Sequence, residues 1–142
     1  MQKQIDVRGP RFGAAITTAV LAIALVALPS ALSSALLAWQ TLAFGLGAFV
    51  GLHAAPYGVL FRKIVVKRVG PATKFEDVQP PRFAQLVGFG FAAVALCAAL
   101  SGLTLVAQIA TGLALGAAFL NSVFAICLGC EMYVIGKRLL NH

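Results

Sequence analysis

The basic residues of this chain occur in three short segments, and two long apolar blocks without any basic residue separate these segments. With 61% hydrophobic and only 11% charged residues, against about 25% charged in soluble domains, too few polar residues remain to cover a water-exposed surface. The pattern therefore predicts an integral membrane protein. The bases are Lys3, Arg8 and Arg11, then Arg62, Lys63, Lys67, Arg68, Lys74 and Arg82, then Lys137 and Arg138.

Each apolar block is long enough for two membrane-spanning helices, which need about 20 predominantly apolar residues each. Breaks are expected at Pro29-Ser30 and at Ser101-Gly102, and a basic loop at 62–82. The fourth span is longer than a perpendicular crossing needs, which predicts a tilt, a kink or an extension beyond the membrane. The sequence thus predicts an all-α fold, a single four-helix transmembrane domain over 1–142. The spans are expected at about 12–28, 36–60, 83–100 and 103–136.

The positions of the bases also predict the orientation. Cytoplasmic segments of membrane proteins carry an excess of lysine and arginine, so we expect both termini and the loop 62–82 in the cytoplasm. The start lacks the layout of a signal peptide and is expected to be retained. Juxtamembrane bases bind anionic lipid more often than nucleic acid, so the expected partner is the lipid bilayer and no nucleic acid is expected.

An internal repeat relates the two halves of the chain. GPRF at 9–12 and PPRF at 80–83 begin the first and third spans, and LGAFVG at 46–51 parallels LGAAFL at 115–120. Both halves enter the membrane from the same side, so the repeat is parallel and its pseudo-twofold axis runs along the membrane normal. We therefore expect two hairpins of the same kind.

Two pairs of glycines, Gly47 with Gly51 and Gly112 with Gly116, have the four-residue spacing of closely packed membrane helices. Small residues at this spacing let helix backbones approach, and van der Waals contact then stabilises the pair. The spacing predicts packing within the chain, or association of copies or of a larger membrane complex along these faces.

The stretch FAICLGCEMYVIGKR, residues 124–138, carries the clearest candidate chemistry. On one continuous helix, Cys127 and Cys130 are about 60° apart and continue the Gly112 face, so they are expected to point inward. Counted back from Lys137 at 1.5 Å per residue, they lie roughly 10–15 Å inside the membrane. They would then stand toward the C-terminal, negative end of the helix dipole, which does not favour a thiolate.

Two cysteines three residues apart are typical of a redox dithiol, because their sulfurs can close a small ring. His53 is predicted at a similar depth, and ionisable residues inside a membrane are functional candidates. Cys127, Cys130, the adjacent Glu131 and His53 are therefore the candidate catalytic residues. Packing alone, or metal binding with His53 or Glu131, are the alternatives. A structural zinc site needs four ligands and a second C-x-x-C is missing, so we expect no metal and no cofactor.

Arg11 and Arg82 stand at the N-termini of the first and third predicted spans, where helix dipoles favour anions. Related by the repeat, they could together hold a small oxyanion or a lipid headgroup. The alternative is that they are interfacial anchors that set the orientation. The chain contains no nucleotide-binding loop, no G-x-S-x-G and no H-E-x-x-H, so hydrolytic and phosphoryl-transfer chemistry is not indicated.

At RGPRFGAAIT, at PPRFAQLVGFGF and at CLGCEMY, the chain resembles a bacterial membrane family, domain-of-unknown-function family 4395. The resemblance extends from about Val7 to Leu140, and its most specific parts are the two PRF motifs and CLGCE with a tyrosine two residues later. It implies a multi-pass protein of the bacterial plasma (inner) membrane. Members often lie near thioredoxin-like and rhodanese-like proteins, so the resemblance favours thiol chemistry without supplying an activity.

Three functions remain open at this point, and whether the chain is an enzyme is not decided. The leading hypothesis is thiol-redox or sulfur handling by Cys127 and Cys130, with a cytosolic thioredoxin-like or rhodanese-like partner that docks on the loop 62–82. The second is a non-enzymatic accessory or assembly subunit of a membrane complex. The third is a small oligomeric transporter of a sulfur-containing anion, with Arg11, Arg82 and the cysteines along its path.

Overall fold

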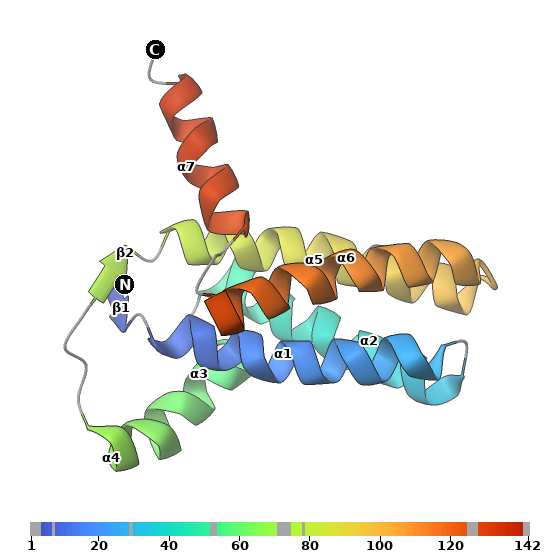
Figure 1. The fold of residues 1–142 in the computed structure, drawn as a ribbon, viewed down its shortest axis with the longest axis horizontal. Helices are drawn as coiled ribbons and strands as arrows, with labels where there is room; N and C mark the ends of the chain where they lie inside the picture. The colour runs from blue at the N-terminus through green and yellow to red at the C-terminus, as the bar shows by residue number, and fades with distance from the viewer. Residues whose placement is uncertain are drawn as a thin grey trace.

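Four long apolar helices run side by side along the length of the molecule (Figure 1). Each is long and apolar enough to cross a membrane, which confirms the predicted all-α membrane fold with four spans. They are α1 (Arg8–Ala27), α2 (Ala31–Gly45) with its π-helical continuation η1 (Leu46–Val50), α5 (Gln79–Leu100) and α6 (Thr104–Phe124). The computed structural model describes residues 4–6, 8–28, 30–51, 54–70, 75–77, 79–124 and 128–140, with side chains described over 8–28, 30–51, 54–70, 79–124 and 131–140.

The shorter elements gather at the end of the bundle where α1 and α5 begin, which we call the basic end. There the second span is followed by a helical segment, Pro56–Val69, which we call the α3–α4 segment. A further helix, α7, follows the fourth span. The elements are β1 (Gln4–Asp6), α3 (Pro56–Leu60), η3 (Phe61–Val65), α4 (Val66–Val69), β2 (Phe75–Asp77) and α7 (Leu128–Leu140).

The two turns at the opposite end have the sequence signals that such turns require. Ser30 caps α2, because its side chain accepts a hydrogen bond from the backbone N–H of Ser33 at 3.4 Å. After α5, Gly102 has a φ of +82°, and the N–H of Leu103 donates to the carbonyl of Ala98 at 2.8 Å. This is the hydrogen bond of a Schellman motif, in which glycine readily supplies the left-handed residue.

The two hairpins interlock around a common centre. α1 packs mainly against α6 and α2, and α5 packs mainly against α2 and α6, so the helices follow one another around the bundle in the order α1, α2, α5, α6. The first helix of each hairpin therefore packs against the second helix of the other. This is the arrangement expected of a parallel repeat.

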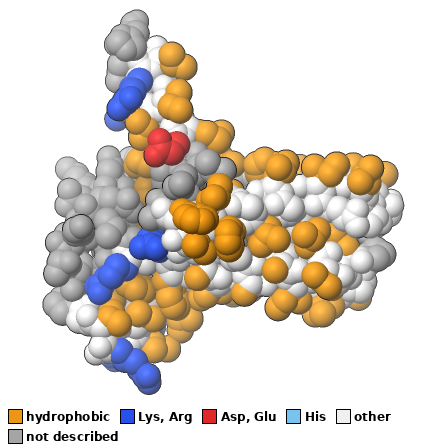
Figure 2. All heavy atoms as spheres, viewed as in Figure 1, with side chains coloured by type: hydrophobic (Ala, Val, Ile, Leu, Met, Phe, Trp, Pro, Cys, Tyr) orange, Lys and Arg blue, Asp and Glu red, His pale blue; other side chains and the backbone are white. Residues whose placement is uncertain are grey.

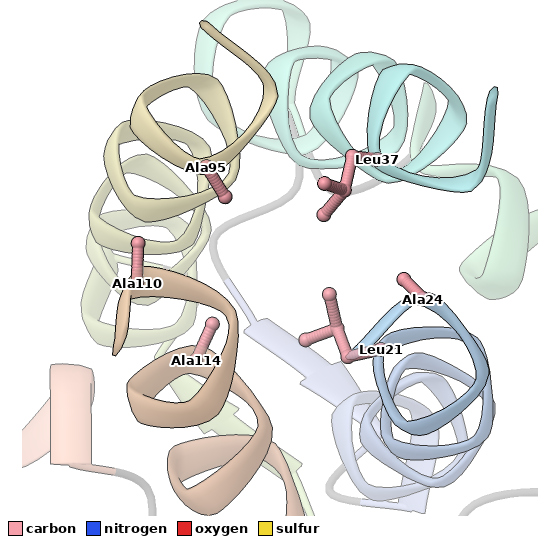
Figure 3. Close-up of a cluster of buried hydrophobic side chains, with 6 residues drawn as sticks. All are labelled: Leu21, Ala24, Leu37, Ala95, Ala110 and Ala114. Carbon is pink, nitrogen blue, oxygen red and sulfur yellow. The ribbon is translucent and has the colours of Figure 1, made fainter. Parts of the chain in front are cut away.

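The centre of the bundle joins large side chains of the first hairpin to small ones of the second. Leu21 and Leu37 are fully buried and point toward alanines on α5 and α6 (Figure 3). Alanine lets the helices approach closely, and close packing without voids stabilises the bundle. The buried cluster consists of Leu21, Ala24, Leu37, Ala95, Ala110 and Ala114.

A two-stranded antiparallel ribbon of β1 and β2, which the sequence analysis did not predict, joins the starts of the two hairpins. Ile5 pairs with Glu76 at its middle. A longer repeat than PRF could have indicated it, since Asp-Val-x-x-Pro-Arg-Phe occurs at both 6–12 and 77–83. The ribbon links the segments that precede α1 and α5 at the basic end.

Two predicted spans end earlier in the structure than hydropathy suggested. The second ends at Val50, where Gly51 has a φ of +139°. The range 103–136 is divided between α6, which ends at Phe124, and α7, which leaves the bundle at a steep angle (Figure 1). The 21 residues of α6 already measure about 31 Å, which is enough to cross the hydrocarbon core. Among the outcomes predicted for the fourth span, the structure therefore has the extension, and this extension is the separate helix α7.

Candidate functional site at the basic end

The two PRF arginines connect the hairpins to one another. Arg82, at the start of the second hairpin, donates from Nε to the Ala48 carbonyl at 2.9 Å and from Nη2 to the Phe49 carbonyl at 3.3 Å. Arg11, at the start of the first, donates from Nη2 to the Ser122 carbonyl at 3.2 Å. Carbonyls in the last turn of a helix lack intrahelical partners and carry the negative end of the dipole. Both guanidinium groups thus bind helix ends, and the predicted role in anion binding stays a prediction.

The two PRF phenylalanines connect each hairpin to the element that follows it. Phe12 packs against Phe61 of η3 in a tilted ring contact with 5.6 Å between the centroids, and Phe83 packs against Tyr133 of α7 in the same way at 5.8 Å. Both distances lie in the range of stabilising aromatic pairs. The repeated motif is therefore architectural, because its arginine binds the other hairpin and its phenylalanine holds the helix that follows its own hairpin.

The structure places only part of the predicted thiol site. Cys127 and His53 lie outside the described residues, and the described part of Cys130 is its backbone, in the first turn of α7. Glu131 follows in the same turn with an exposed side chain. The position expected for the pair, near the negative end of one continuous helix, is therefore wrong for Cys130. Because α7 begins at Leu128, Cys130 stands near the positive end of a second helix.

The glycine faces differ from one another. A Cβ placed on Gly47 would lie 2.9 Å from Oε1 of Gln85 on α5, so this glycine serves packing within the chain. A Cβ on Gly112 or Gly116 would meet no atom within 4 Å. The expectation that the Gly112 face points inward is therefore wrong, since this side of α6 is open within the described chain.

A chain of polar side chains beneath the basic end was missed by the sequence analysis. Trp39 Nε1 donates to the Tyr57 hydroxyl at 3.0 Å, this hydroxyl donates to Gln40 Oε1 at 2.7 Å, and Gln40 Nε2 donates to Thr17 Oγ1 at 3.4 Å. Burial raises the pKa of Tyr57 above its usual value of 10.0, and the Trp39 hydrogen bond lowers it by less. The adjacent Trp39 and Gln40 in an apolar span were the available signal. These bonds fasten α3 to α1 and α2.

Residues 5–138 match the model of a family described as a domain of unknown function, DUF4395. The chain belongs to the DUF4395 family. This confirms the resemblance found in the sequence, and the matched range includes both PRF motifs and the C-x-x-C pair. Neither a curated protein nor a solved structure matches the chain. The DUF4395 domain therefore contains the reciprocal arginine contacts, the four spans and most of α7.

Proposed function

We propose that the protein is a membrane-bound dithiol carrier, in which Cys127 and Cys130 exchange electrons or sulfane sulfur with a cytosolic protein. The observation that supports this proposal is that α7 runs in a different direction from the last span (Figure 1). Since α6 ends at Phe124 and α7 begins at Leu128, the C-x-x-C pair straddles the junction of a membrane span and a helix outside the bundle. A soluble partner reaches such a junction more easily than the interior of a continuous span.

The electrostatics of this junction favour a thiolate. Cys130 lies in the first turn of α7, where the helix dipole is equivalent to about half a positive charge. Thiolates of C-x-x-C proteins gain stability at such helix N-termini. The guanidinium of Arg11 adds positive charge at the end of α6, because it binds Ser122 two residues before α6 ends. Glu131 opposes these effects, but its side chain is exposed and water screens it.

The exchange proceeds by two substitutions at sulfur. The thiolate of one cysteine attacks the disulfide of a thioredoxin-like partner, forms a mixed disulfide and releases one partner sulfur as a thiolate. The second cysteine then attacks the mixed disulfide, closes the Cys127–Cys130 disulfide and releases the other partner sulfur. Two electrons pass to the partner, which leaves as a dithiol after taking up the two protons of the cysteines. With a rhodanese-like partner, the thiolate instead takes the terminal sulfur of a persulfide and leaves the partner as a thiolate.

The partner docks from the cytoplasm of a bacterial cell in this proposal. The abundance of bases at the basic end supports a cytoplasmic location of both termini under the positive-inside rule, and family membership supports the bacterial plasma membrane.

Differential alkylation of the full-length protein in native membranes tests the proposal. We expect oxidant to remove alkylation of Cys127 and Cys130 together, while Cys97 on α5 keeps its reactivity and serves as the internal control. Cys127→Ser should trap a mixed disulfide on Cys130, and Cys97→Ser should change nothing. If the pair stays reduced under oxidant and the serine variant of the pair traps no partner, the dithiol function is refuted.

A second function, an accessory subunit of a larger membrane complex, is favoured by the open side of α6 at Gly112 and Gly116. Small residues on an uncovered helix face let another helix approach closely. Purification in mild detergent should then retain partner chains, and Gly112→Ile should release them. A protein that elutes alone at every detergent concentration speaks against this function. Transport has less support, because leucine and alanine fill the described centre of the bundle.

A further inference from the structure

Two segments that carry both bases and exposed apolar side chains leave the bundle at its basic end, on opposite sides (Figure 1). One is α7 and the other is the α3–α4 segment. We propose that both lie in the plane of the membrane interface and bind anionic lipid headgroups, which makes the basic end a recognition surface for anionic lipid. The proposal is independent of the cysteine chemistry.

One side of α7 carries a strip of apolar side chains. At 100° per residue, Met132, Ile135 and Leu139 fall within an arc of about 60°, whereas Lys137 lies about 170° and Arg138 about 90° from the middle of that arc. The three apolar side chains are 52%, 55% and 72% exposed. Figure 2 shows the hydrophobic side chains of this helix on the side that faces along the bundle and its bases on the other side. A helix outside a bundle with such faces is typical of the membrane interface.

The position of α7 places its apolar face on hydrocarbon. The helix starts where α6 has completed a membrane-spanning length and then turns steeply away from the bundle. Its axis therefore runs across the direction of the spans, close to the plane of the membrane. Tyr133 contacts Phe83 near the start of α5 and has Lys137 Nζ 5.9 Å from its ring centroid. Tyrosine and lysine together are typical of the boundary between lipid and water.

The α3–α4 segment follows the second span of the first hairpin as α7 follows the fourth span, and it too combines bases with exposed apolar side chains. It contains four bases and no acidic residue, and Leu60, Ile64 and Val69 are exposed beside them. Phe61 holds it against Phe12, as Tyr133 holds α7 against Phe83. The bases of the two segments are Arg62, Lys63, Lys67, Arg68, Lys137 and Arg138.

Charge and apolar surface together select lipid as the occupant. The two segments together contain six bases and one acidic residue, Glu131, so their surface is complementary to anionic headgroups. A nucleic acid or a soluble acidic protein would bind the bases but would leave the apolar face of α7 in water. An anionic bilayer satisfies both faces at once.

Tryptophan fluorescence of the full-length protein in nanodiscs tests the position of α7. In a Trp39→Phe background, Ile135→Trp places the probe on the apolar face and Lys137→Trp places it on the opposite face. We expect brominated acyl chains to quench Ile135→Trp strongly and a water-soluble quencher to act mainly on Lys137→Trp. Equal quenching of both variants from water would overturn the proposal. So would an Ile135→Trp probe shielded from both quenchers, since a protein would then cover this face.

Lipid preference tests the headgroup site. Nanodiscs that mix phosphatidylglycerol with phosphatidylcholine should leave phosphatidylglycerol enriched on the protein in native mass spectrometry. Each neutralised base, as in Lys137→Gln or Lys67→Gln, should weaken this enrichment about fivefold. Glu131→Gln is the control of opposite sign and should strengthen it. Equal retention of the two lipids by the wild type, or no response to the three variants, would refute the recognition of anionic lipid.

Discussion

Gly88 on α5 lies directly against the ring of Phe44 on α2, and this contact allows a quantitative test of how the hairpins interlock. A Cβ on Gly88 would lie 2.6 Å from Cε1 and 2.7 Å from Cζ of Phe44. Carbon atoms in good contact are about 3.5–4.0 Å apart, so in Gly88→Ala the ring must move by about 1 Å or α2 and α5 must separate.

Gly112 on α6 supplies the matched control, because a Cβ there meets no atom within 4 Å. Overpacking costs about 1–3 kcal/mol, and replacing glycine by alanine inside a helix contributes about 1 kcal/mol of stability. We therefore expect Gly88→Ala to lose up to about 2 kcal/mol and Gly112→Ala to gain up to about 1 kcal/mol. The helix-propensity gain cancels in the difference between the two variants, so about 1–3 kcal/mol reports the Phe44 contact alone.

Equilibrium unfolding by sodium dodecyl sulfate from a mild detergent, followed by far-ultraviolet circular dichroism, measures both variants. A second measurement of Gly88→Ala in a Phe44→Ala background should show no loss, because the obstructing ring is gone. If Gly88→Ala is as stable as Gly112→Ala, α2 and α5 do not approach one another at this point and the packing described above is refuted. A loss of stability in Gly112→Ala that grows with protein concentration would show that another chain covers α6.

Two further predictions concern the basic end. Arg82→Ala removes two hydrogen bonds from a charged group and Arg11→Ala removes one. Because each such bond contributes about 1.5–3 kcal/mol, the unfolding free energy should fall roughly twice as much in Arg82→Ala as in Arg11→Ala. Equal losses in the two variants would contradict the two contacts of Arg82. In Tyr133→Phe, where Tyr57 is the remaining tyrosine, ultraviolet titration should give a midpoint above 10.0 that rises further in Trp39→Phe. Because the tyrosine of the unfolded chain then loses its proton at a lower pH than that of the folded chain, the unfolding free energy should fall as the pH rises above 10.0. A titration midpoint at or below 10.0 would show that the Tyr57 hydroxyl is not buried.

The membrane spans follow from the sequence because their physics is local. An apolar run has to satisfy its backbone within itself, so it becomes a helix of membrane-spanning length. Ser30 and Gly102 then mark where the chain turns. The end of α6 at Phe124 has no such local signal, since the apolar sequence continues beyond it. The direction that the chain takes beyond it is held by the Phe83–Tyr133 contact with α5, which couples residues far apart in sequence.

The sequence predicts where the candidate site lies along the chain, but it does not predict the electrostatic environment of the site. Cys127 and Cys130 are recognisable from spacing alone, whereas the direction of the dipole at Cys130 depends on which helix contains it. Likewise, arginine at a helix start suggests an anion site when the partner helix is unknown. The carbonyls that Arg11 and Arg82 bind belong to the opposite hairpin, and periodicity within one hairpin contains no information about them.

The reciprocal arginine contacts have a consequence for biosynthesis. Arg82 leaves the ribosome after its acceptors, Ala48 and Phe49, have been made, whereas the acceptor of Arg11 lies 111 residues further along the chain. During synthesis, the first hairpin thus enters the membrane with its arginine still hydrated at the surface. That side chain meets a helix end only after the fourth span has been inserted. Chain termination before Ser122 would leave the Arg82 contacts in place and the ring of helices open on the other side.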